Sequence, residues 1–299
     1  MMPLRRREMP KNLKYAYYPG CSLKGSGHHY EASLLAVFKA LGIELEEIPD
    51  WNCCGATAYM AVDEMAAFGM VARNLALVQK MGYREVVAPC AACYLGLKKA
   101  QAYIRDYPHI AEKVCSALAK AGLEYNCEQP IAVKHPLEVL VQDYGLERLR
   151  EKVKNPLRGH RIAPYYGCQL TRPFADMDDS FYPTIMDKVL EAMGAEVISD
   201  YPLKTRCCGA SLTGTIPEVG SRLSWLIISE AERHGADYIA TACPLCQFNL
   251  EGFQNKMKAW EGKNPRYPIL YFTQVMGLAL GLSKKELGFG QLVYQPAKV

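Results

Sequence analysis

The sequence lacks the features that mark several large classes of protein. Its formal net charge is only +4 over 299 residues, too small a surplus to indicate a nucleic-acid-binding surface. No uninterrupted apolar run approaches the roughly 18 residues that a membrane helix needs. No apolar segment follows Arg5, Arg6 and Arg7, as it would in a secretory signal. We therefore expect a cytoplasmic protein with no membrane span and no nucleic-acid partner.

Two familiar cofactor motifs are also missing. The chain has no G-x-G-x-x-G sequence, which binds the dinucleotide of flavin or nicotinamide cofactors. It has no C-x2-C-x2-C-x3-C run, which holds the clusters of bacterial ferredoxins. If this protein carries out redox chemistry, its electrons are expected to come from another polypeptide.

Cysteine, by contrast, is abundant, with 12 residues. Thiols stay reduced in the cytosol, so a cysteine-rich cytosolic chain more often binds metal or does redox chemistry than forms disulfides. Ten of the twelve form two sets of five in the same order, C-x31-CC-x35-C-x-x-C and then C-x38-CC-x34-C-x-x-C. The first set comprises Cys21, Cys53, Cys54, Cys90 and Cys93, and the second Cys168, Cys207, Cys208, Cys243 and Cys246.

The sequence around these cysteines repeats as well. In each half, two helical patterns alternate with short strand-like runs. The helical patterns end near Gly42 and Lys80 in the first half, and near Gly194 and His234 in the second. The strand-like runs are residues 43–48 and 85–88 in the first half, and 195–199 and 238–241 in the second. This alternation predicts an α/β fold with two repeated halves, each a small parallel sheet flanked by helices. The cysteines all fall in strand-to-helix loops, so we expect them at the carboxyl ends of the strands.

We place the domains at residues 14–145 and 146–299, after a basic tail over residues 1–13. The linker is expected between about Glu124 and His160. If the halves pack as a pseudo-two-fold pair, the two cysteine sets will lie near each other.

Three chemistries compete for five cysteines per set. Disulfides seldom persist in the cytosol, and two adjacent cysteines rarely fit disulfide geometry with separate partners. Zinc takes four ligands in a closed tetrahedron, so a fifth cysteine exceeds its needs, and zinc is the less favoured metal. A cubane 4Fe–4S cluster also needs four thiolates, and a fifth thiolate suggests a cluster of a different shape. We favour iron–sulfur ligation.

The double pattern, with glycine after each cysteine pair, resembles the cysteine-rich CCG domain, and two tandem copies resemble the B subunit of heterodisulfide reductase. The resemblance covers roughly residues 14–280. It implies two non-cubane 4Fe–4S clusters, one on each five-cysteine set, with a disulfide substrate between them. It also implies two partners of the same complex: a ferredoxin-like iron–sulfur subunit (the C type) together with a flavoprotein subunit (the A type).

Several other residues are candidates for supporting roles. His135 is a candidate catalytic proton donor, with helix capping as the alternative. Lys204 and Arg206 are candidates to bind an anionic substrate tail or tune a cluster potential, with a solvated loop as the alternative. Gly55 and Gly209 are expected to permit backbone conformations that other residues resist.

Further residues have more ordinary interpretations. The helices expected after Cys93 and Cys246 should direct amide dipoles at anionic clusters, and Pro244 suits a first helical turn. We expect His28 and His29 to lie in a surface loop. Cys115 and Cys127 fall outside both sets, and Cys115 is expected to be a packed or idle thiol.

The sequence leaves three functions open. The first is an oxidoreductase subunit that reduces or forms a disulfide, whose substrate could be the coenzyme M–coenzyme B heterodisulfide or a protein-bound lipoyl group. The second is an electron-transfer CCG subunit of a glycolate, lactate or succinate dehydrogenase. The third is a zinc-stabilised scaffold without redox activity.

Overall fold

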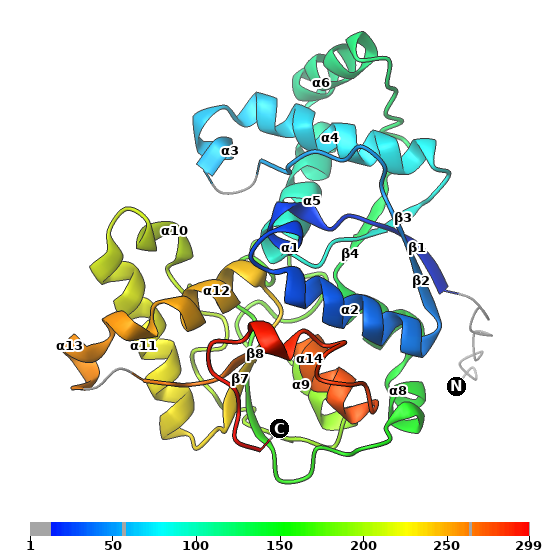
Figure 1. The fold of residues 1–299 in the computed structure, drawn as a ribbon. Coiled ribbons are helices and arrows are strands. Elements are labelled where there is room, and N and C mark those ends of the chain that lie inside the picture. The colour runs from blue at the N-terminus through cyan, green and yellow to red at the C-terminus, as the bar shows by residue number, and fades with distance from the viewer. Residues whose placement is uncertain (1–12, 56–57, 263–264, 299) are drawn as a thin grey trace, which may run out of the picture.

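The computed structural model describes residues 13–55, 58–262 and 265–298. Each half of the chain forms a four-stranded parallel sheet flanked by helices (Figure 1). The predicted α/β fold with two repeated halves is therefore confirmed. Of the predicted tail, residues 1–12 lie outside the described residues, and Leu13 begins the first strand.

The two sheets share one strand order. The first is ordered β2-β1-β3-β4 and the second β6-β5-β7-β8. The strands of the first half are β1 (Leu13–Tyr17), β2 (Ile43–Glu47), β3 (Glu85–Val87) and β4 (Ala132–Lys134). Those of the second are β5 (Arg161–Tyr165), β6 (Glu196–Val197), β7 (Tyr238–Thr241) and β8 (Ile269–Tyr271).

Helices connect successive strands in both halves. In the first half they are α1 (Gly20–Lys24), α2 (His28–Leu41), α3 (Ala58–Val62), α4 (Glu64–Lys80), α5 (Ala91–Asp106), α6 (Pro108–Lys120), α7 (Pro136–Glu138), a π-helix (Val139–Tyr144) and α8 (Leu146–Lys152). In the second they are α9 (Ile185–Ala192), α10 (Ala210–Thr213), α11 (Pro217–Arg233), α12 (Pro244–Gly252), α13 (Lys258–Glu261) and α14 (Phe272–Ala279). Short 3-10 turns cover Gln254–Lys256 and Phe289–Gln291.

The fourth strand of each sheet was not predicted. β4 and β8 have three residues each, too few to show an alternating pattern in the sequence. Residues 132–134, which lie within the expected linker, pair with β3 instead. The predicted strand over 195–199 shortens to Glu196 and Val197. The boundary at residues 145 and 146 lies between β4 and β5 and stays a prediction.

The halves are joined by buried contacts of α2 with β8 and α14. Tyr30 stacks on Tyr271, with ring centroids 4.3 Å apart, and the Ser33 and Thr273 hydroxyl oxygens are 2.7 Å apart. All four side chains are buried, so apolar burial and hydrogen bonding both hold the halves in a fixed arrangement.

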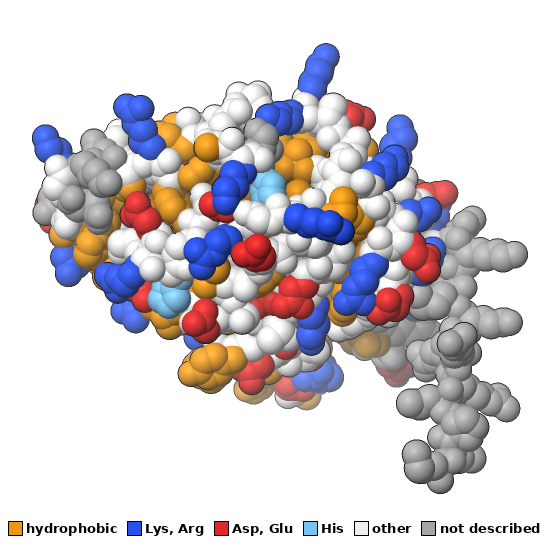
Figure 2. All heavy atoms as spheres, turned by 90° about the horizontal axis from the view of Figure 1, so that it is seen from below, with side chains coloured by type: hydrophobic (Ala, Val, Ile, Leu, Met, Phe, Trp, Pro, Cys, Tyr) orange, Lys and Arg blue, Asp and Glu red, His pale blue; other side chains and the backbone are white. Residues whose placement is uncertain are grey.

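Charges of both signs are interspersed on the face that Figure 2 shows, as the small net charge suggested. Among the described residues, no helix has the length and apolar character to cross a membrane.

Candidate metal centre

The ten repeated cysteines lie where the sequence placed them, beyond the carboxyl ends of the strands. In the first half, Cys21 lies in α1 after β1, Cys53 and Cys54 follow β2, and Cys90 is the residue before α5. The second half repeats this order, and Cys243 directly precedes α12. Because the carboxyl ends of parallel strands meet at one edge of a sheet, each half gathers its five thiols there.

In the first set, neighbouring thiols interact with one another. The Sγ atoms of Cys54 and Cys93 are 3.3 Å apart, and Cys90 contacts Cys93. The pKa of Cys53 is raised, mainly by the neighbouring Cys54 thiol and by burial; the Cys21 thiol adds a weaker effect. Cys54, Cys90 and Cys93 are buried, whereas Cys21 and Cys53 are exposed, so this set runs from the interior to the surface.

The second set surrounds a cavity. The cavity has a volume of about 130 Å³, and all five cysteines of the set contribute to its lining. The Cys168 and Cys208 thiols hold the pKa of Cys207 well below its usual range, and the Arg172 guanidinium adds to this effect. Cys207 is the exposed thiol of the set, so a thiolate is favoured where the cavity approaches the surface.

The two sets meet at Cys90 and Cys243. The Cys243 and Cys93 thiols hold the pKa of Cys90 well below its usual range, so Cys243 lies close to Cys90 across the halves. The sets therefore adjoin between the two halves, as expected for halves that pack as a pair.

Backbone amides at helix N-termini face the buried thiols. The N–H groups of Ala92 and Cys93 at the start of α5 stabilise the Cys90 thiolate, and the Cys246 N–H does the same for Cys243. Pro244 occupies the first turn of α12, as predicted. Such amides are suited to an anionic group.

The glycine after each cysteine pair has the expected backbone conformation. Gly55 and Gly209 have φ angles of +63° and +83°, and their N–H groups point at Cys53 Sγ and Cys207 Sγ, each at 3.4 Å. The predicted conformational role of these glycines is confirmed, and each also directs an amide at a thiol.

A second pair of glycines was missed in the sequence. Gly20 and Gly167 directly precede the first cysteine of each set and have φ angles of +69° and +73°. A Cβ on Gly20 would lie 2.8 Å from Cys93 Sγ, and one on Gly167 would lie 3.0 Å from Cys246 Sγ. The sequence did contain a sign of this role, because both repeats have glycine directly before the first cysteine of the set. Bare backbone here leaves room for the last thiol of each set.

His135 caps a helix in this structure. It follows β4 and is fully buried; its Nδ1 accepts a hydrogen bond from the Leu137 N–H, and its Nε2 lies 3.0 Å from the Pro89 carbonyl oxygen. Burial lowers the pKa of His135 to about 4. The structure thus gives the ring the capping role that the sequence had allowed, and its role as a proton donor stays a prediction.

Lys204 is not available to a substrate. Its Nζ lies 2.7 Å from Asp187 Oδ2 and 3.0 Å from the Pro183 carbonyl oxygen, and the residue is buried. The expectation of a substrate-binding or solvated lysine was wrong, because a carboxylate 17 positions earlier pairs with it. Arg206 is exposed, which fits the solvated loop.

His28 and His29 lie in α2, not in a loop. His28 is exposed, but His29 is buried with its ring 5.0 Å from that of Tyr271. The expectation of a surface loop was wrong for His29, because α2 packs this residue against the other half of the chain.

The donor set fits a sulfur-rich inorganic cluster. Ten thiols, inward-facing amides and a thiol-lined cavity supply anionic sulfur ligands and stabilise negative charge. Among the residues that the structure describes, no three or more Cys, His, Asp or Glu side chains are grouped to hold one metal ion.

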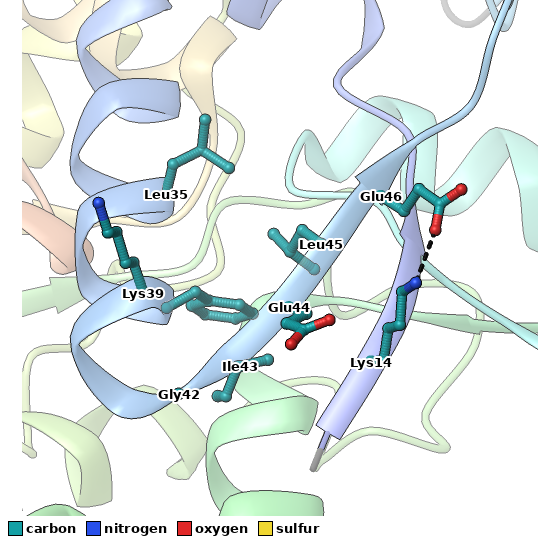
Figure 3. A pocket seen from close by; sticks show the side chains of 9 residues that line it. Lys14, Leu35, Lys39, Gly42, Ile43, Glu44, Leu45 and Glu46 are labelled. Atoms are coloured by element: carbon teal, nitrogen blue, oxygen red, sulfur yellow. Dashed lines mark ion pairs between the residues drawn. The ribbon is translucent and has the colours of Figure 1, made fainter.

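A hollow larger than this cavity lies away from these cysteines. It has a volume of about 600 Å³ and lies beside the edge strand β2 and α2. Figure 3 shows Lys14 and Glu46 paired at its rim, at 2.9 Å and half exposed. An exposed ion pair contributes little and indicates no chemistry.

A family model for the CCG cysteine-rich domain matches residues 15–98 and 162–251. The chain belongs to the CCG family. Both matched regions contain a complete five-cysteine set, so the family is identified by the residues that form the site.

Relatives of this CCG protein include subunits named for two kinds of reductase. It is 33% identical, over 96% of its length and 99% of the relative's, to the 8-methylmenaquinol:fumarate reductase membrane anchor subunit of Wolinella succinogenes. It is 32% identical, over 92% and 93%, to a protein of Archaeoglobus profundus named as similar to the B subunit of heterodisulfide reductase. It is 28% identical, over 94% of both chains, to the B subunit of a CoB–CoM heterodisulfide reductase of Methanosarcina acetivorans.

One solved structure shares the fold. A hypothetical protein from Helicobacter pylori superposes with a TM-score of 0.76 at 16% identity, over 97% of this chain and 54% of that one. This similarity concerns the fold alone.

Proposed function

We propose that this CCG protein is the iron–sulfur subunit of a heterodisulfide reductase-like complex, which reduces a disulfide or, in reverse, forms one. Its ten repeated cysteines would hold two non-cubane 4Fe–4S clusters, one on each set. Iron–sulfur clusters bound there would supply single electrons. The sets are Cys21, Cys53, Cys54, Cys90 and Cys93, and Cys168, Cys207, Cys208, Cys243 and Cys246.

The observation that carries this proposal is that the two five-cysteine sets adjoin, with Cys243 of one set close enough to Cys90 of the other to lower its pKa. Splitting one disulfide consumes two electrons and two protons and yields two thiols. Two one-electron centres on adjoining ligand sets can act on the same S–S bond. An electron relay would not need its two sites to adjoin. The adjacency of the two cysteine sets therefore favours a substrate that both share.

Another cavity, beside that of the second cysteine set, offers room for the substrate. It has a volume of about 350 Å³, and Gln169 lines both it and the cavity of the second cysteine set. Its other walls include Met60, Ala92 and Leu95 from the first half. The cavity thus lies between residues of both halves, and its largely apolar lining can exclude water from a reacting sulfur.

The electrons would come from partner subunits. We propose a ferredoxin-like iron–sulfur subunit and a flavoprotein subunit as these partners. The names of the CoB–CoM reductase relatives, each a B subunit of a ferredoxin-dependent enzyme, support a complex of several subunits. A disulfide or dithiol, among them a protein-bound lipoyl group, remains the proposed substrate class.

A specific observation favours a second candidate. The 33% identity to a subunit of a fumarate reductase supports an electron relay to a flavoprotein that acts on succinate or fumarate. In that case, the cysteines would carry electrons and no disulfide would be cleaved.

One spectroscopic experiment separates the two. The anaerobic protein is oxidised with and without coenzyme M, coenzyme B or dihydrolipoamide, and its paramagnetic resonance spectrum is recorded. For a disulfide-acting subunit, we expect a new signal only when a matching thiol is present. A spectrum that no thiol alters, together with reoxidation of the reduced protein by fumarate and its flavoprotein, would favour the relay.

A further inference from the structure

The cavity proposed for the substrate has a charged side chain in its wall. Among the described residues that line this cavity of about 350 Å³, Lys99 is the charged one, and the others are apolar apart from Gln169. Glu64, which forms an ion pair with Lys99, does not contribute to the lining. The wall therefore presents a positive charge to a molecule that enters the cavity.

This lysine lies on the same helix as a predicted cluster ligand. α5 has Cys93 in its first turn. Four residues of α5 line the cavity, and their spacing places them on one face of the helix: Ala92, Leu95, Gly96 and Lys99. Lys99 is six residues after Cys93, and a helix rises about 1.5 Å per residue, so about 9 Å separates the two along the helix axis.

The Lys99 ammonium is held at this wall and can still bind an anion. Its Nζ lies 2.8 Å from Glu64 Oε1 and 3.3 Å from Met60 Sδ, and 5.1 Å from the centroid of the Tyr103 ring. Glu64 and Met60 take two of the three N–H groups of the ammonium, so the third can donate to a bound anion. The Lys99 side chain is 27% exposed and that of Glu64 48%. A pair with this much solvent contact is weak, so an anionic group of the substrate can share the lysine with Glu64 or replace it.

We propose that Lys99 binds the anionic tail of the disulfide substrate and so determines which disulfides this protein accepts. The preferred class is a disulfide or dithiol with a terminal carboxylate, sulfonate or phosphate, on a chain long enough to span about 9 Å from the sulfur. A lipoyl group joined to a protein through an amide has a neutral tail and gains no such contact. This inference rests on the proposed function, because it concerns the substrate of the same site.

Matched thiols that differ only in the charge of the tail test the proposal. Dihydrolipoate carries a carboxylate, and dihydrolipoamide carries a neutral amide in its place. The anaerobic, cluster-containing protein is oxidised with increasing concentrations of each thiol, and the concentration that half-saturates the thiol-dependent paramagnetic signal is determined. We expect dihydrolipoate to half-saturate the signal at about one-tenth of the concentration that dihydrolipoamide requires, which is the effect of one hydrogen bond to a charged group. Half-saturation at the same concentration would overturn the proposal.

Three variants assign the preference to the Lys99 ammonium. Lys99→Gln should raise the half-saturating concentration of dihydrolipoate about ten-fold and leave that of dihydrolipoamide unchanged, a split that a general disturbance of the site would not produce. Lys99→Arg should keep the preference, because the positive charge remains. Lys14→Gln is the matched control and should also keep it, since Lys14 pairs with Glu46 at 2.9 Å but lines a different hollow. A preference that persists in Lys99→Gln, or that disappears in Lys14→Gln, would contradict the role of Lys99.

The same titrations separate this inference from the proposed function. If neither thiol produces a signal although the protein contains its full iron, the disulfide chemistry is refuted and the inference with it. If both thiols produce the signal at equal concentrations, the disulfide chemistry stands and only the role of Lys99 is refuted. Iron content should be unchanged in all three variants, because neither lysine belongs to a cysteine set.

Discussion

Replacing Cys208 with serine is expected to remove about half of the iron and acid-labile sulfide from the anaerobic protein. A hydroxyl is a far poorer ligand than a thiolate for iron in a sulfur-rich cluster. The fold should survive, because the Cys208 backbone carbonyl keeps its hydrogen bonds from Asn249 and Ser224, at 2.7 and 3.1 Å. The second set should then be empty while the first remains filled.

The mirror variant and a control complete this experiment. Cys54→Ser should empty the first set, because Cys54 contacts Cys93 at 3.3 Å. Cys115→Ser should leave the iron content whole, since that residue lies outside both sets. Iron content unchanged in both Cys208→Ser and Cys54→Ser would show that the cysteine sets are wrongly assigned.

Gly20→Ala and Gly167→Ala are each expected to lower the iron content about as much as the cysteine variants do, although neither residue has a side chain that could bind iron. The added Cβ would lie 2.8 Å from Cys93 Sγ in one case and 3.0 Å from Cys246 Sγ in the other. Both sulfur atoms are buried, so the clash displaces a ligand that has nowhere to go. Iron and sulfide analysis of each variant measures the effect.

Gly42→Ala is the matched control for backbone strain. Gly42 also has a positive φ, +72°, but a Cβ there would meet no atom within 4 Å. A left-handed alanine costs about 1–2 kcal/mol at any of these positions, so the control shares this cost without the clash. If Gly42→Ala loses as much iron as Gly20→Ala, strain and not sulfur contact would be the cause.

Much of the fold and site was predictable because the same pattern occurs twice in the sequence. Residues 43–48 and 85–88 lie between helical patterns, and the same order recurs in the second half, so a parallel α/β sheet was the simplest arrangement. A parallel sheet then places every strand-to-helix loop at one edge. Cys21 and Cys53 could therefore be assigned to the same site from their positions in the chain alone.

What could not be predicted depends on contacts between distant residues. The three residues of β4 are too few to show a period, so their place beside β3 is set by the surrounding packing. Lys204 was interpreted as exposed because nothing near it in sequence pairs with it, whereas Asp187 does so in the folded chain. Gly20 was overlooked because its role concerns Cys93, which is 73 positions later.

Metal analysis of the anaerobically purified protein tests the central assignment most directly. If each five-cysteine set holds one cluster, the chain should contain roughly eight iron and eight acid-labile sulfide, about four of each per set. Stoichiometric zinc with no iron or sulfide would contradict the account, because both redox functions require the clusters.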